Sequence, residues 1–272
     1  MVIEPRRIQA ATLAGRFYPA EKEFLGNVVE RYFATVITNS GENRNRTVPK
    51  AVIAPHSGYI YSGPVAAAAF AAWKSAFEHI RRLVVIGPSH QFDFPGLALP
   101  DATTFATPLG ELSLDQDSCE MILKHKFVRI FQAPYENEQS IEVLLPFLQR
   151  IAPDIQIVPL ITGHADSSQI AALIEELWGG EETVFVISSD LSRSQKYSVA
   201  RKMDSDTSDA IQKFEASKIN SDQACGYRAI RGFLKAALQR EMSCQIVDLR
   251  NSADTAAVDT DITGFGAFHF YE

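Results

Sequence analysis

Short, almost wholly apolar runs alternate with longer amphipathic runs along most of this 272-residue chain. Such apolar runs are typical of strands buried on both faces, which are mostly parallel and covered by helices. We therefore expect an α/β fold with a central, largely parallel or mixed sheet flanked by helices. The expected strands are residues 50–54, 82–87, 96–99, 156–161, 183–188, 245–249 and 264–270.

Two of the expected helices contain a proline. Ser62 precedes helix 63–77, and Pro64 falls in its first turn, where the missing N–H costs nothing, so we expect Ser62 to be the N-cap. Pro146 interrupts the apolar stripe of helix 138–151 and should kink it by freeing the carbonyl of Glu142. The other expected helices are residues 21–35, 115–124, 166–178, 199–214 and 222–238, and the polar residues 38–49 are expected to form a surface loop.

Composition excludes several classes of protein. A hydrophobic content of 46% supports a full core, and a net charge of -7 argues against coating nucleic acid. Three scattered cysteines are too few for a disulfide scaffold or a zinc ribbon. No apolar run has the length of a signal peptide or a membrane span, and no linker forces a boundary. We expect one cytoplasmic domain over residues 1–272, with no membrane or nucleic-acid partner.

Candidate functional residues come from position, because GxGxxG, GxxxxGK[ST], HExxH and GxSxG motifs are absent. Open α/β sheets bind ligands at the carboxyl ends of their strands. His56, His90 and Asp190 each follow a predicted strand, and His164 is a weaker candidate of the same kind. Imidazoles and a carboxylate at one sheet edge suit a transition metal. The alternative is that each is a loop residue bonded to backbone.

Cys225 lies near the start of the predicted helix 222–238. A helix N-terminus lowers a thiol pKa, and the thiolate is the form that binds metal. Gly226 beside it would let a metal or ligand approach the backbone. The alternative is a buried small hydrophobe, which is the interpretation we give to Cys119 and Cys244.

Seven short strings occur in the order seen in the Memo family, which includes protein B of the AmmeMemoRadiSam system. The chain resembles this family from about Arg7 to its C-terminus. The strings are Ala14-Gly-Arg-Phe-Tyr-Pro19, Ala54-Pro-His-Ser-Gly-Tyr59, Gly87-Pro-Ser-His90, Thr107-Pro-Leu-Gly110, Glu138-Gln-Ser-Ile-Glu142, Ser188-Ser-Asp190 and Ala224-Cys-Gly226.

The resemblance implies a single α/β domain similar to the class III extradiol dioxygenases, which are non-haem iron enzymes. It also implies a metal site of His56, His90 and Cys225, with Asp190 lining the same pocket. Iron or copper is the implied metal, with zinc as a further option. Implied partners are a radical-SAM enzyme, an AMMECR-like protein and, from human Memo, phosphotyrosine-containing proteins.

Two positions depart from the family pattern. Gln139 and Arg193 stand where the family usually has histidines. Glutamine cannot titrate and arginine stays protonated near pH 7, so neither can act as a general base. These changes leave the implied metal ligands intact but argue against dioxygenase-type chemistry. Arg193 could instead hold an anionic ligand through its planar donor fork.

Three hypotheses for function follow. In the first, a non-haem metal-dependent oxidoreductase uses His56, His90 and Cys225 as ligands, and Asp190 orients them or adds a further ligand. In the second, a non-catalytic module binds an anionic small molecule or phosphopeptide in the same cleft, through Arg193, Gln139 and Tyr59. A zinc hydrolase using Asp190 ranks last. The first hypothesis requires two imidazoles and one sulfur within bonding reach of a single ion.

Overall fold

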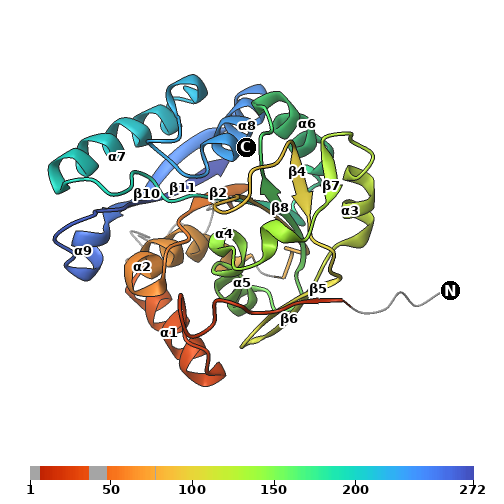
Figure 1. The fold of residues 1–272 in the computed structure, drawn as a ribbon, viewed down its shortest axis with the longest axis horizontal. Coiled ribbons are helices and arrows are strands. Elements are labelled where there is room, and N and C mark those ends of the chain that lie inside the picture. The colour runs from red at the N-terminus through yellow and green to blue at the C-terminus, as the bar shows by residue number, and fades with distance from the viewer. Residues whose placement is uncertain (1–6, 37–47, 77) are drawn as a thin grey trace.

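The computed structural model describes residues 7–36, 48–76 and 78–272, and within them the largest element is an eight-stranded mixed sheet (Figure 1). Its four central strands are parallel, whereas both flanks contain antiparallel pairs. The predicted fold class and all seven predicted strands are therefore confirmed. In spatial order the strands are β10 (Ser243–Asn251), β11 (Gly264–Tyr271), β2 (Ala51–Ala54), β9 (Thr183–Ser188), β3 (Arg82–Pro88), β8 (Gln156–Thr162), β4 (Leu97–Leu99) and β7 (Val128–Ile130).

A second sheet in the described part of the chain has three short strands that the sequence did not reveal. They are β1 (Ile8–Gln9), β5 (Thr104–Thr107) and β6 (Gly110–Ser113). The strand β7 was also missed. Each has only two to four residues, and β6 buries one residue of its four, so none produces a detectable apolar run.

Helices cover both faces of the large sheet. In Figure 1, α1, α2, α4 and α5 gather on one side, while α6, α7 and α8 lie on the other. None of the helices in the described ranges combines the length and apolarity needed to cross a bilayer. The helices are α1 (Lys22–Thr35), α2 (Tyr59–Phe70), α3 (Gln116–Ile122), α4 (Gln139–Glu142), α5 (Leu145–Ile151), α6 (Ser167–Leu177), α7 (Tyr197–Gln212), α8 (Tyr227–Gln239) and α9 (Ser252–Ala256). Residues 38–47 of the predicted loop, and residue 77, lie outside the described residues.

The start of α2 corrects one prediction. The helix begins at Tyr59, so Pro64 lies inside it and Ser62 is not its N-cap. Ser62 instead donates its hydroxyl to the carbonyl of Ser57 at 2.7 Å, and its N–H donates to the carbonyl of Gly58 at 3.1 Å. The early start has a packing cause, because the Tyr59 ring is buried. An aromatic anchor there stabilises a helical turn that propensity alone does not indicate.

The predicted kink at Pro146 is a complete break. The predicted helix 138–151 is divided into α4 and α5, and Pro146 is the second residue of α5, where it needs no N–H donor. Because α4 is a separate turn, its N-cap Glu138 and its last residue Glu142 both direct buried carboxylates inward. The first points toward His90 and the second toward the N-terminal segment. The second, on Glu142, accepts hydrogen bonds from Thr12, Leu13 and Tyr18.

Candidate metal centre

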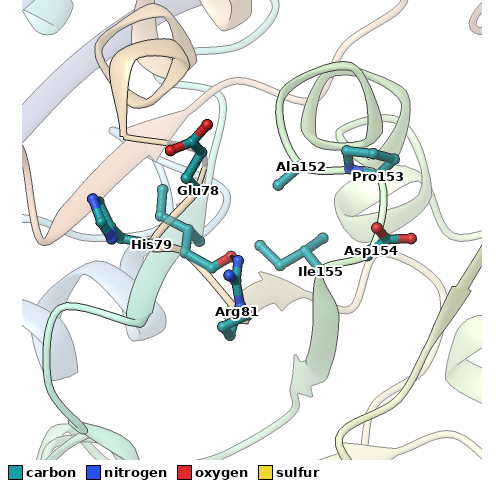
Figure 2. A pocket seen from close by; sticks show the side chains of 8 residues that line it. Glu78, His79, Arg81, Ala152, Pro153, Asp154 and Ile155 are labelled. Atoms are coloured by element: carbon teal, nitrogen blue, oxygen red, sulfur yellow. Dashed lines mark hydrogen bonds between the residues drawn. The ribbon is translucent and has the colours of Figure 1, made fainter.

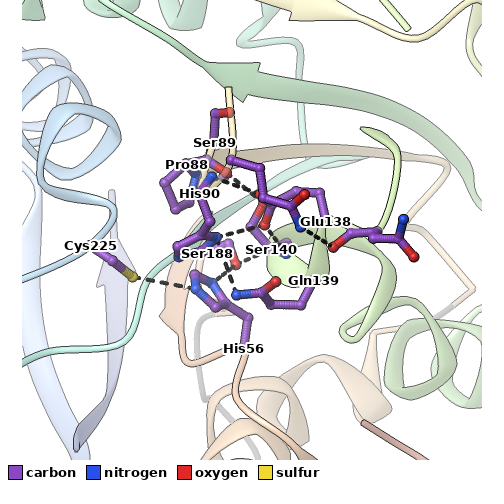
Figure 3. A network of polar contacts seen from close by, with 12 residues as sticks. His56, Pro88, Ser89, His90, Glu138, Gln139, Ser140, Ser188 and Cys225 are labelled. Atoms are coloured by element: carbon purple, nitrogen blue, oxygen red, sulfur yellow. Dashed lines mark hydrogen bonds and ion pairs between the residues drawn. The ribbon is translucent and has the colours of Figure 1, made fainter. Parts of the chain in front are cut away.

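Three side chains from distant parts of the sequence meet at the carboxyl edge of the parallel strands. His56 follows β2, His90 follows β3, and Cys225 comes from the segment just before α8. One ligand atom from each lies within 4.8 Å of the others. In Figure 3 the Cys225 sulfur points toward the His56 ring, and the side chain of His90 lies beside that ring. The structure thus brings together the three residues that the sequence analysis singled out.

The His56 imidazole is buried and fixed in one tautomer. Its Nδ1 lies 2.7 Å from the Ser188 hydroxyl, which itself donates to the carbonyl of Ser140 at 2.5 Å. Since that hydroxyl has one proton, and Ser140 receives it, the neutral imidazole must carry its proton on Nδ1. Its Nε2 faces Sγ of Cys225, 3.3 Å away.

His90 is oriented by Glu138, a residue that the sequence analysis did not single out. Glu138 accepts from Nδ1 of His90 at 2.7 Å and from the His90 backbone N–H at 2.8 Å. Burial alone would raise the pKa of Glu138, but these contacts hold it below its usual range. The Nε2 of His90 is left for the cluster. The signal for Glu138 was its place as an acidic residue capping α4, where it accepts from the N–H of Ser140.

Cys225 is a thiolate at neutral pH. Burial would raise its pKa, but His56 and His90 lower it to about 5. The N–H of Asp190 also donates to the sulfur at 3.3 Å. The predicted helix 222–238 begins only at Tyr227, so imidazoles, rather than a helix N-terminus, are the main cause. Gly226 lets the segment that carries Cys225 pack closely against the end of β9, because a Cβ at this position would lie 2.6 Å from the carbonyl oxygen of Ser188.

Asp190 positions the His56 loop and lies outside the three-residue cluster. Its Oδ1 accepts from the His56 N–H at 2.9 Å, and its Oδ2 accepts from the Ser57 hydroxyl at 2.7 Å. Burial would raise the pKa of Asp190, but the neighbouring His56 and Arg193 lower it. With both oxygens engaged, this carboxylate has the role of an orienting residue.

The remaining predicted pocket residues divide into two groups. Arg193 and Gln139 border the cluster: an Arg193 terminal nitrogen lies 3.1 Å from Nε2 of His90, and the Gln139 amide nitrogen lies 3.2 Å from Nδ1. Tyr59 points away into the core, where its hydroxyl donates to the carbonyl of Val143 at 2.9 Å. His164 is exposed and pairs with Asp93, outside the cluster.

A cavity of about 730 Å³ lies at the opposite edge of the sheet (Figure 2). It is lined by residues 78–81, which precede β3, and 152–155, which precede β8. Ligands of α/β sheets bind at the other, carboxyl edge. The lining includes His79 but no cysteine. The candidate functional site is therefore the His56, His90 and Cys225 cluster.

The charges of the cluster fit a metal cation. Three groups in the pocket carry negative charge: the Cys225 thiolate and the carboxylates of Asp190 and Glu138. The Arg193 guanidinium carries one positive charge, so the pocket has a net charge of about -2 when both imidazoles are neutral. Burial would lower the pKa of His90, but Cys225 and Glu138 raise it to about 9. The pocket thus attracts positive charge, and a divalent ion would balance it.

The donor geometry fits a metal after a small closure. One ion bonded to nitrogen at about 2.1 Å and to sulfur at about 2.3 Å spans at most about 4.4 Å. His56 and Cys225 already satisfy this at 3.3 Å. Separations of up to 4.8 Å in the cluster therefore involve His90. A side-chain shift of His90 would complete the set.

The fold and the cluster define an α/β protein with a candidate two-histidine, one-cysteine metal centre. The chain belongs to the Memo-like protein family, whose model matches residues 9–268. A MEMO1 family protein of Methanosarcina acetivorans is 31% identical, over 94% of this chain and 96% of its own length. One from Aquifex aeolicus is 27% identical, over 95% and 97%. Among solved structures, uncharacterized protein JW3007 from Escherichia coli K12 matches with a TM-score of 0.46 and 14% identity, over 80% of this chain and 99% of its own.

Proposed function

We propose that this protein binds a redox-active transition metal, iron or copper, through His56, His90 and Cys225. The observation that carries the proposal is the convergence of the three donor atoms within 4.8 Å at the ligand-binding edge of the sheet. Two imidazoles and a thiolate suit iron, copper or zinc, and three protein ligands leave positions for an exogenous molecule. The bound metal would supply Lewis-acid or electron-transfer chemistry.

The surrounding contacts support this proposal. Metal-binding histidines usually donate their second ring N–H to a fixed acceptor, which sets the tautomer. Here Ser188 and Glu138 perform that task for His56 and His90. Each contact uses Nδ1, so both Nε2 atoms are the ones available to a metal.

The proposal does not include acid–base chemistry by the neighbouring side chains. Gln139 and Arg193 lie beside His90, but neither can remove a proton from a substrate near pH 7. We therefore favour a metal-binding redox role over extradiol dioxygenase chemistry.

The competing proposal, a metal-free module for an anionic ligand or phosphopeptide, has weaker support. Its three proposed contacts were Arg193, Gln139 and Tyr59. Arg193 is available, with its side chain 40% exposed, but the Tyr59 hydroxyl is buried against Val143. Binding of phosphate to metal-free protein in calorimetry would favour this competitor.

Metal analysis of protein purified without oxygen tests the main proposal. We expect about one iron or copper ion per chain in the wild type, and loss of that ion in His56→Ala and Cys225→Ser. Cys244→Ser is the matched control, because Cys244 is a half-buried thiol on β10 outside the cluster. Retention of the metal in both cluster variants would overturn the proposal.

A further inference from the structure

The Arg193 side chain contacts Nε2 of His90, the nitrogen that would bind a metal. One terminal nitrogen of its guanidinium lies 3.1 Å from Nε2 of His90 and 3.3 Å from Oδ2 of Asp190. Because the guanidinium can only donate, this contact is a hydrogen bond to the neutral form of His90, in which Nε2 carries the lone pair. A metal bonded to that nitrogen cannot coexist with this hydrogen bond, so metal binding must displace Arg193.

Only the side chain of Arg193 has to move. Its backbone lies between two anchored segments: Leu191 and Ser192 exchange hydrogen bonds with Gly264, and Gln195 pairs with Ile262 in both directions. The side chain itself is 40% exposed. A rotamer change can therefore free His90 without rearrangement of the loop.

The displaced guanidinium would need a new partner beside the metal. Within the described residues, the hydrogen bonds of the Arg193 side chain are made by one terminal nitrogen, so its other donors are available. A guanidinium matches the oxygens of a carboxylate, sulfate or phosphate group in a bidentate pair. An oxyanion that binds Arg193 would also remove it from His90.

We propose that the pocket binds a metal and an oxyanion cooperatively, with Arg193 as the coupling residue. Without the oxyanion, Arg193 competes with the metal for Nε2 of His90. With it, Arg193 holds the anion and His90 is free to close on the metal. By linkage, each ligand tightens the binding of the other by the same factor. This inference rests on the proposed function and assigns oxyanions as its ligand class.

Cobalt(II) titrations of metal-free protein test the coupling, followed by the thiolate-to-cobalt absorption band. Each titration is done in sodium chloride alone and again with part of the chloride replaced by sulfate or by acetate. The ionic strength is the same in all three salts, so the screening of charges is constant. We expect the cobalt dissociation constant to fall about tenfold with an oxyanion, within the usual range of coupling between sites. A larger effect of sulfate or of acetate shows which oxyanion geometry the site prefers.

Two variants distinguish coupling from other effects of the salts. Arg193→Gln should bind cobalt with the same absorption band but lose the oxyanion effect. Arg228→Gln should keep the effect, because Arg228 contacts His164 rather than the cluster. An unchanged dissociation constant in the wild type, or an equal shift in Arg193→Gln, would overturn the coupling.

The outcomes separate this inference from the proposed function. If cobalt binds, and Cys225→Ser abolishes its band while oxyanions have no effect, the metal site stands and the coupling is wrong. If the wild type forms no thiolate-to-cobalt band in any of the salts, both proposals fail.

Discussion

Neighbouring charges, rather than burial, distinguish the three thiols of this chain. Burial raises the pKa of Cys119 and of Cys244 to about 12. Burial acts on Cys225 in the same direction, yet the imidazoles lower its pKa to about 5. Cys225 is therefore the one thiol of the three that is ionised at neutral pH.

This difference predicts selective alkylation of the metal-free protein. Iodoacetamide at pH 7 should modify Cys225 and leave the other two thiols largely unmodified, because the thiolate is the nucleophile. Peptide mass spectrometry measures the extent at each site. The rate at Cys225 should rise with pH around an apparent pKa of about 5.

His56→Ala is the informative variant for this prediction, because it removes the neighbouring imidazole that lowers the pKa of the Cys225 thiol. Its Cys225 profile should shift to higher pH, with the rate at pH 7 reduced severalfold. An unchanged profile in this variant would show that His56 does not set the thiol pKa.

The sequence could supply the donors of the site but not the residues that hold them. His56, His90 and Asp190 were found because each follows an apolar strand, and Cys225 because it lies near a predicted helix start. The family resemblance then joined His56, His90 and Cys225 into one ligand set. Ser188 was not found, because its role depends on the position of the Ser140 carbonyl, which only the folded chain reveals.

At the scale of helices, the contact between α1 and α2 depends on glycine. A Cβ at Gly63 of α2 would lie 2.5 Å from the ring of Tyr32, whereas one at Gly26 of α1 would meet its nearest atom at 3.9 Å. Gly63→Ala should therefore destabilise the protein by about 1–3 kcal/mol through overpacking. Gly26→Ala should stabilise it by about 0.5–1 kcal/mol through helix propensity. Urea denaturation measures both, and equal effects would contradict this account of the interface.

The carboxylate that joins α7 to the Arg193 loop gives stability a pH dependence. Burial raises the pKa of Asp204 to about 6 from 3.8, although the Ser192 N–H lowers it in part. An acid whose pKa is higher in the folded than in the unfolded state stabilises the fold at low pH. This contribution is complete below the unfolded-state pKa and is lost as the pH rises through the folded-state pKa. Between about pH 4 and 6 the wild type should lose about 3 kcal/mol from this group.

Asp204→Asn tests this effect, because the amide keeps an oxygen that can accept from Ser192 but cannot ionise. The difference in unfolding free energy between variant and wild type should grow in favour of the variant from pH 4 to 6, and then stay level. Parallel profiles over this range would show that Asp204 does not titrate differently on folding.

Strands that are buried along their whole length were predictable from the sequence, whereas short strands without a detectable apolar run were missed. The strands β2, β3 and β9 are apolar at nearly every position, so their ranges were predicted within a residue. The two-residue β1 contains no such signal. The start of α2 was wrong because it depends on the packing of Tyr59 against Tyr18 and Phe147, which lie far away in sequence.

At the scale of the whole molecule, the parallel order of the strands creates the site. Because β2, β9 and β3 are adjacent and parallel, the residues that follow them emerge at one edge, in the order His56, Asp190 and His90. Cys225 completes the cluster from the segment before α8, 135 residues after His90 by the chain numbering. A metal bound there would join segments that meet only in the folded state.

Metal binding should therefore stabilise the entire fold. The unfolded chain separates the three donors, so a ligand that binds only the folded state adds about 2.7 kcal/mol at a free concentration of 100 times its Kd. For a chain of this size, that corresponds to an increase in Tm of about 5–10 °C. Calorimetry of metal-free protein with and without cobalt(II) measures the change, and a chelator should reverse it. Cys225→Ser should show no increase, and an equal increase in that variant would place the stabilising metal elsewhere.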